Sequence, residues 1–121
     1  MPDMVENVDA IRAAAAAYIE SWLAGDEARM RGCLNPELAK RRVADPASGE
    51  LSLHEVPAAA LVADAAMPKE GIAPGYSIDI LDVTAGSASV KVLSAPFVDY
   101  LHLARFGQRW LIVNVLYERK S

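Results

Sequence analysis

The closing part of the chain, residues 97–118, alternates apolar and polar positions on either side of Gly107-Gln108. This alternation predicts two β-strands joined by a two-residue turn, and a glycine at the first central position suits type II′. The turn fixes the register and so decides which side chains share a face. One predicted face carries Asp99, Leu101, Leu103, Arg105, Trp110, Ile112, Asn114, Leu116 and Glu118. The other carries Val98, Tyr100, His102, Ala104, Phe106, Leu111, Val113, Val115 and Tyr117.

The beginning of the chain has helical spacing instead. Apolar residues over 5–23 recur on one stripe, and Gly25 is the natural place for that helix to end. Asp26 can cap a second helix that runs to about Leu34. Asn35-Pro36 ends it, because the residue before a proline is disfavoured in the helical region.

The middle of the chain predicts a short strand and a third helix. Residues 38–43 suit the strand. Residues 52–55, Ser-Leu-His-Glu, have capping-box spacing and predict a helix that runs to about Met67. Pro57 conflicts with a start at Leu53, so the helix either kinks there or begins near Val56.

Two further strands complete the pattern, one over 76–83 and one over 88–92. Helices come first and an antiparallel meander follows, which is typical of α+β proteins rather than alternating α/β proteins. We therefore expect three N-terminal helices packed on a mainly antiparallel sheet, in one domain spanning 1–121.

Composition and charge narrow the classes of function. Apolar residues make up 53% and charged residues 23% of the chain, as in ordinary globular proteins. The net charge of −4 argues against nucleic-acid binding, which requires a basic face. The basic run 40–42 is expected to be a solvated strand or loop.

Compartment and membrane association follow from the same sequence. The single Cys33 excludes an internal disulfide. Residues 1–7 lack the basic and apolar regions of a signal peptide, and no apolar stretch is long enough to span a membrane. We expect a cytoplasmic protein that binds neither membrane nor nucleic acid.

Several chemistries have no motif here. The chain lacks a glycine-rich phosphate loop, a dinucleotide fingerprint and a Gly-x-Ser-x-Gly elbow. Its only histidines are His54 and His102, and they show no metal-ligand spacing with Cys33. No metal and no cofactor are therefore expected. His54 is predicted to be exposed in the first turn of the third helix.

Asp99 is the strongest candidate for chemistry, because it falls among apolar residues on its predicted face. A buried carboxylate must be paired, hydrogen-bonded or protonated. One interpretation pairs it with Arg105 or Arg12. The other places it beside an apolar cavity, where its pKa rises and it can act as an acid or base.

A candidate ligand site follows from the same face. Tyr18 lies at the edge of the first helix's apolar stripe, and Trp22 lies one turn further on as a core anchor that can also wall a cavity. Asn114 can orient Asp99 or hold a ligand carbonyl, or it satisfies backbone groups at a bend. The predicted ligand-binding residues are Tyr18, Trp22, Asp99, Asn114 and Leu116. Of these, Asp99 and Tyr18 are the catalytic candidates.

The opposite face of the hairpin is a candidate dimer surface. It is apolar as well, so we expect a second copy of the chain to cover it. The predicted interface residues are Tyr100, His102, Val113 and Val115.

Four segments carry a resemblance to a known superfamily. They are 16–26 (AAYIESWLAGD), 34–41 (LNPELAKR), 99–103 (DYLHL) and 107–114 (GQRWLIVN). Together they resemble the nuclear transport factor 2-like superfamily, and within it the branch called putative lumazine-binding proteins, over about residues 8–118. The resemblance implies a cone-shaped, cystatin-like α+β fold whose curved sheet and helices enclose a pocket.

The resemblance also implies a range of activities. The superfamily includes ketosteroid isomerase, scytalone dehydratase, limonene epoxide hydrolase and polyketide-cyclase-like proteins, together with members that only bind or assemble. Its enzymes use an aspartate or histidine base with tyrosine or aspartate donors in a dry cavity, so Tyr18 and Asp99 resemble such donors. Asn35 stands where many relatives have the base, and asparagine cannot abstract a proton at neutral pH.

Three functions remain open. The first is a small-molecule-binding domain with an apolar pocket and no assigned reaction. The second is a cofactor-independent isomerase, dehydratase or hydrolase acting on an apolar or cyclic molecule. The third is a non-catalytic dimeric interaction module.

Overall fold

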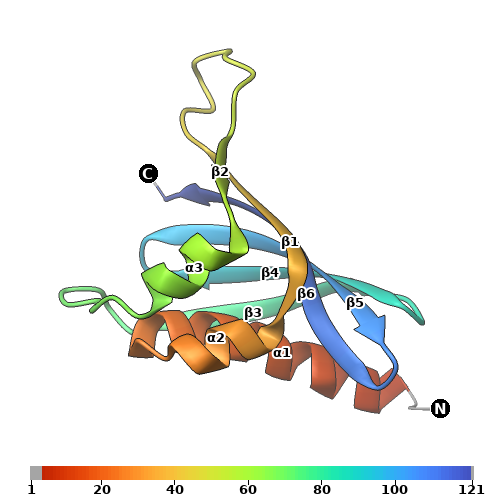
Figure 1. Ribbon diagram of the computed structural model, residues 1–121. Coiled ribbons are helices and arrows are strands. Elements are labelled where there is room, and N and C mark those ends of the chain that lie inside the picture. Colours follow the sequence, from red (N-terminus) through yellow and green to blue (C-terminus); the bar gives the residue numbers. More distant parts are fainter. Residues whose placement is uncertain (1–3, 121) are drawn as a thin grey trace.

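The computed structural model describes residues 4–120, which form three helices and a six-stranded sheet. All three helices lie on one side of the curved sheet (Figure 1). They are α1 (Met4–Ala24), α2 (Glu27–Cys33) and α3 (Ala58–Ala65). The expected α+β class, with helices packed on a curved sheet, is confirmed. Residues 1–3, part of the segment in which no signal peptide was predicted, lie outside the described residues.

The sheet is mixed but mostly antiparallel, in the order β2-β1-β6-β5-β4-β3. Its strands are β1 (Leu34–Val43), β2 (His54–Val56), β3 (Tyr76–Val83), β4 (Ser87–Ser94), β5 (Phe97–Phe106) and β6 (Arg109–Arg119). β1 and β6 pair in parallel, and the other neighbours pair antiparallel. The segment between β1 and β2 projects away from the rest of the molecule (Figure 1).

The first two helices begin and end where the sequence predicts. Gly25, with φ +73°, follows α1 in the left-handed region that glycine adopts without strain. The Asp26 carboxylate accepts a 3.0 Å hydrogen bond from the Arg29 backbone N–H and so caps α2. None of the helices in the described part of the chain is long and apolar enough to cross a membrane.

The third helix differs from the capping-box prediction. His54–Val56 is strand β2, which pairs with 40–42 of β1, so the backbone groups of this segment are used by the sheet. The helix begins only after Pro57, whose extended backbone occupies the cap position. His54 is exposed, as expected, but in a strand rather than a helix.

The β5–β6 hairpin has the predicted turn but not the predicted register. Phe106 pairs with Arg109 across a two-residue turn, and Gly107 has φ +67°, as a type II′ turn requires. Leu103 then pairs with Ile112, whereas His102 pairs with Asn114. One residue of β6 is therefore extra, which is a β-bulge.

The bulge moves every later β6 side chain to the opposite face. Val115 is 1% exposed and packs toward the helices, whereas Leu116 is 41% exposed on the outer face. The predictions that Asn114 and Leu116 share a face with Asp99, and that Val115 lies on the outer face, are therefore wrong. Tyr117, which pairs with Asp99, moves to the inner face instead.

The core fills the space between α1 and the inner face of the sheet. Its side chains without exposed surface include Ile11 and Ala15 of α1, Val90 of β4, Leu101 of β5 and Ile112 of β6. Toward the N-terminal end of α1, the Trp110 indole donates a 3.3 Å hydrogen bond to buried Asn7. Toward its C-terminal end, by contrast, a cavity remains.

Candidate functional site

The cavity lies between the C-terminal half of α1, helix α3 and the inner face of the sheet, and its volume is about 200 Å³. It is lined by Tyr18, Ile19, Trp22, Lys40, Asp64, Ser94, Phe97, Asp99 and Tyr117. An engineered apolar cavity of about 150 Å³ holds a benzene molecule, whereas sites for drug-sized ligands start at about 300 Å³. This cavity therefore has room for a small cyclic molecule.

A chain of three polar side chains crosses the cavity wall. Lys40 Nζ donates a 2.6 Å hydrogen bond to the Tyr18 hydroxyl, and that hydroxyl donates a 2.7 Å hydrogen bond to Asp99 Oδ2. All three side chains are buried, with exposed fractions of 7% for Lys40, 3% for Tyr18 and 7% for Asp99. The tyrosine thus connects an amine and a carboxylate.

Three separate elements position this chain. Tyr18 lies on the inner stripe of α1, and Asp99 follows the inward alternation of β5. β1 runs parallel to β6, and in this pairing Lys40 lies beside Val115, which is buried. Lys40 therefore lies on the inner face of the sheet, at the cavity. The site therefore depends on the crossover that brings β1 beside β6.

The expected arginine partners do not reach Asp99. In residues 4–120, neither Arg12 nor Arg105 forms an ion pair with it. The Arg12 guanidinium instead donates a 3.4 Å hydrogen bond to the Ile78 carbonyl oxygen. Asp99 instead accepts a hydrogen bond from Tyr18, which in turn accepts one from Lys40. The predicted pairing of Asp99 with an arginine is therefore wrong.

Burial opposes charge on both ends of the chain. It raises the pKa of the Asp99 carboxyl, although the Lys40 charge and the Tyr18 hydrogen bond act in the other direction. It lowers the pKa of the Lys40 ammonium, although the charges of Asp99 and Asp64 act in the other direction. The Tyr18 pKa is raised well above its usual value by burial and then by Asp99. The cavity therefore favours a neutral acid and a neutral amine more than water does.

Aromatic rings form the remaining walls. Phe97 packs edge to face with Trp22 and with Tyr117, at centroid distances of 5.9 Å and 5.5 Å. Lys40 Nζ lies 4.4 Å from the centroid of the Tyr117 ring and 5.1 Å from that of Tyr18. Flat apolar surfaces therefore surround one cationic group.

Helix α3 fixes the indole at the side of the cavity. Trp22 Nε1 donates a 2.8 Å hydrogen bond to Asp64 Oδ2. Lys69 Nζ lies 4.8 Å from the centroid of the Trp22 ring and donates to the backbone oxygens of Asp64 and Met67. Trp22 is therefore held in place from the α3 side while its ring lines the cavity.

The structure brings three of the five predicted ligand-binding residues together: Tyr18, Trp22 and Asp99. It places Asn114 on the outer face, with its Nδ2 atom 3.1 Å from His102 Nδ1, and it leaves Leu116 exposed there as well. Neither lies in the cavity, because of the β6 bulge.

The sequence interpretation missed Lys40, Asp64, Phe97 and Tyr117. For Lys40 a signal was present, since it lies two positions after Leu38 in a predicted strand and alternation places both on one face. Both are buried. The prediction of a solvated basic run is therefore wrong for Lys40, whereas Arg41 is exposed.

Asn35, where a base was expected from the resemblance, has a local structural role. Its side-chain oxygen accepts a 2.8 Å hydrogen bond from the Glu37 backbone N–H. This is an Asx-type turn at the start of β1. Asn35 is not among the residues that line the cavity.

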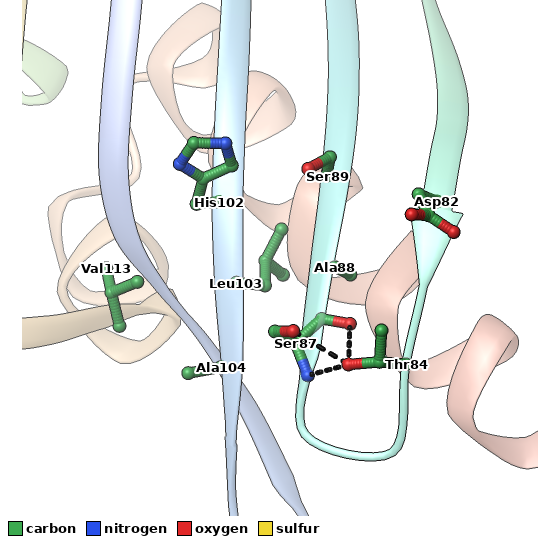
Figure 2. A pocket seen from close by; sticks show the side chains of 9 residues that line it. All are labelled: Asp82, Thr84, Ser87, Ala88, Ser89, His102, Leu103, Ala104 and Val113. Atoms are coloured by element: carbon green, nitrogen blue, oxygen red, sulfur yellow. Dashed lines mark hydrogen bonds between the residues drawn. The ribbon is translucent and has the colours of Figure 1, made fainter.

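The outer face of the sheet has a shallower pocket of about 230 Å³. Figure 2 shows His102 and Ser89 side by side above it, with the Thr84–Ser87 hydrogen bonds closing the β3–β4 turn. Of the predicted interface residues, Tyr100 and His102 are exposed here and Val113 lines the pocket. Val115 does not belong to this face, since it is buried in the core.

Solved structures with the same fold are numerous. A nuclear transport factor 2-like protein of unknown function from Silicibacter pomeroyi superposes with a TM-score of 0.78 at 18% identity, covering 98% of this chain and 100% of its own. One from Shewanella baltica gives 0.74 at 18% identity, covering 100% and 99%. A third, from Novosphingobium aromaticivorans and described as having a cystatin-like fold, gives 0.67 at 13% identity, covering 98% and 84%.

These likenesses confirm the nuclear transport factor 2-like, cystatin-like fold. A comparison with curated proteins found no match. Residues 6–118 match the family described as "Putative lumazine-binding", which spans nearly the whole chain and agrees with the resemblance seen in the sequence. The chain therefore belongs to the "Putative lumazine-binding" family.

Proposed function

We propose that this protein binds a small cyclic molecule in the cavity between α1, α3 and the sheet. The observation that carries the proposal is the Lys40–Tyr18–Asp99 hydrogen-bond chain beside an aromatic-walled space of about 200 Å³. A small-molecule site usually has a few polar groups among apolar walls. Such groups orient a ligand that the walls hold.

The chemistry of the lining indicates a planar ring that carries a carbonyl or another acceptor. Trp22, Phe97 and Tyr117 offer flat surfaces, and Lys40 has ammonium protons beyond the one it gives to Tyr18. The family description names lumazine, a planar two-ring heterocycle with carbonyl oxygens. Lumazine is therefore the first ligand to test.

A titration followed by NMR tests this proposal. Trp22 lines the cavity, whereas Trp110 is buried against Asn7 at the other end of α1, so the two indole N–H signals serve as probe and internal control. Added lumazine is expected to shift the Trp22 signal saturably and leave the Trp110 signal in place. Lys40→Met should weaken binding by about tenfold or more, because a charged hydrogen bond contributes roughly 1.5–3 kcal/mol.

One result of the same titration would contradict the proposal. If neither lumazine nor a one-ring analogue such as benzyl alcohol shifts the Trp22 signal at millimolar concentration, the cavity is not a ligand site. Arg41→Met is the matched control, since Arg41 is the exposed neighbour of Lys40 in β1. It should leave the affinity unchanged.

A second candidate function is cofactor-independent proton transfer, as in an isomerase, dehydratase or hydrolase. The observation that favours it is a buried carboxyl whose pKa is raised and which accepts a hydrogen bond from Tyr18. A carboxyl whose pKa is raised by burial keeps its proton to a higher pH and can act as an acid or base. Deuterium exchange into a cyclic enone should be faster with the wild type than with Asp99→Asn, and equal rates would exclude this function.

The outer sheet face supports a third, compatible proposal, a homodimer. Tyr100 is 41% exposed and Leu116 is 41% exposed on that face, and the partly buried Val113 lies nearby. Apolar surface of this kind is commonly covered by a partner. Sedimentation at micromolar concentration should give a dimer that Tyr100→Glu dissociates, and a wild-type monomer would contradict it. The cytoplasmic location stays a prediction.

A further inference from the structure

Lys40 places a primary amine in the buried wall of the cavity. Its neighbours on the same face, Leu38 and Val115, are apolar core residues. Burying an ammonium is unfavourable, and replacing a buried ion pair as a whole by well-packed apolar residues is often at least as stabilising. Its Nζ atom nevertheless lines the cavity, 2.6 Å from the Tyr18 hydroxyl. The position of this amine therefore points to chemistry.

We propose that Lys40 is a nucleophile that forms an imine with a small aromatic aldehyde bound in the cavity. The inference rests on the proposed function, because it requires that the cavity admit a ring. The geometry that carries it is a single primary amine, walled by Tyr18 and Tyr117, at one end of a hydrogen-bond chain that leads to a carboxylate.

The hydrogen-bond chain can make the amine nucleophilic without solvent. A proton passes from the Lys40 ammonium to the Tyr18 oxygen as the Tyr18 proton passes to Asp99. The pKa directions agree with this transfer, since burial lowers the pKa of Lys40 and raises that of Asp99. The result is a neutral amine and a neutral carboxylic acid, and burial makes this transfer easier than it is in water.

The condensation then balances within the site. The amine lone pair attacks the aldehyde carbon, a C–N bond forms, and the C=O π electrons move to oxygen, which takes a proton from the nitrogen. Asp99 returns its proton through Tyr18 to the resulting hydroxyl, which leaves as water. An iminium on Lys40 and a carboxylate on Asp99 remain, so the site regains the charges with which it started.

The cavity selects the class of carbonyl compound. Its volume of about 200 Å³ and its aromatic walls suit a small flat ring system. An aldehyde carbon carries only one large substituent, so it can approach an amine that is hemmed in by two tyrosine rings. Benzaldehyde is therefore a suitable probe.

The remaining lysines serve as internal references. They are Lys69, Lys91 and Lys120. Lys91 projects from β4 on the outer face, 5.8 Å from the centroid of the Tyr100 ring. It is the best matched control, because it is also a strand residue near a tyrosine ring.

The test is reductive trapping of the full chain with benzaldehyde and cyanoborohydride near neutral pH, followed by peptide mass mapping. A benzyl adduct on Lys40 is expected to form at least about tenfold faster than on Lys91, equivalent to roughly 1.4 kcal/mol in barrier. Lys40→Arg keeps a cation but should abolish the fast adduct, whereas Lys91→Arg should leave it unchanged. Asp99→Asn should slow trapping at Lys40, because the acid that returns a proton to the departing hydroxyl is lost.

Two results separate this inference from the proposed function. If benzyl alcohol shifts the Trp22 indole signal but Lys40 is trapped no faster than Lys91, the imine inference is wrong and ligand binding stands. If neither lumazine nor benzyl alcohol shifts the Trp22 signal and Lys40 is not trapped, both are wrong. Because the wild-type chain alone provides this comparison, the test does not depend on any variant folding.

Discussion

The Tyr18 hydroxyl donates a 2.7 Å hydrogen bond to Asp99 Oδ2, although 81 positions separate the two residues. It also accepts a hydrogen bond from Lys40, so one oxygen atom connects helix α1 to strands β1 and β5. The contact joins α1 to the sheet beside the cavity.

Tyr18→Phe is the first prediction. The substitution keeps the ring but leaves Lys40 without its acceptor and Asp99 without its donor. Loss of one partner in a buried polar contact costs about 1–3 kcal/mol. Urea denaturation should show a loss of this size. Tyr100→Phe is the control, because Tyr100 is 41% exposed, and it should change the free energy of unfolding by no more than about 0.5 kcal/mol.

The second prediction concerns the ionisation of Asp99. Its pKa is raised from a reference value of 3.8 by burial, while Lys40 and Tyr18 act to lower it. A carboxyl-carbon NMR titration of the wild type should therefore show Asp99 titrating above 3.8. Tyr18→Phe should move it further up, because the lowering hydrogen bond is lost. If Asp99 is already mostly ionised at pH 3.8, the argument that burial raises its pKa is wrong.

Much of the fold could be predicted from the sequence, because local rules govern it. The helix end at Gly25, the cap at Asp26 and the turn at Gly107 each follow from the residue itself. The β2 strand could not be predicted in this way. Its residues 54–56 pair with β1, and these hydrogen bonds between strands outweigh the helix start that the local capping-box pattern predicts.

The candidate site was half predictable, for a related reason. Tyr18, Trp22 and Asp99 follow from periodicity along single elements. Asn114 was misplaced because a bulge, which adds one residue to a strand, cannot be seen in an alternating pattern that simply continues. Lys40 was missed because a run of basic residues is usually solvated, whereas its alternation with Leu38 and the parallel pairing of β1 with β6 place it on the buried face.

The bulge itself gives the third prediction. Asn114 is partly exposed beside His102, whereas its neighbour Val115 is 1% exposed in the core. Asn114→Val should therefore change stability by no more than about 0.5 kcal/mol, whereas Val115→Asn should destabilise by about 3 kcal/mol or more, because it buries an unpartnered amide in place of a methyl pair. Thermal unfolding of the two variants measures the difference. The opposite ranking would mean that the hairpin lacks the bulge.

The last prediction is a pH dependence of stability that appears when Lys40 is removed. In Lys40→Met the charge that lowers the pKa of Asp99 is lost, so this pKa rises further above its unfolded value. A group whose folded pKa is raised contributes stability that is fully present below the unfolded pKa and is lost as pH rises through the folded pKa.

Lys40→Met should therefore lose stability progressively as the pH rises above the unfolded pKa of Asp99 and through its raised folded pKa, and more steeply than the wild type. The double variant Lys40→Met/Asp99→Asn has no carboxyl to ionise there, so its stability should follow the wild type or exceed it and should lack this slope. Urea unfolding at several pH values measures all three proteins. Parallel curves for the single and double variants would show that Asp99 does not carry the dependence, whereas a slope that is steepest in the single variant and absent from the double variant identifies Lys40 as the charge that lowers the pKa of Asp99.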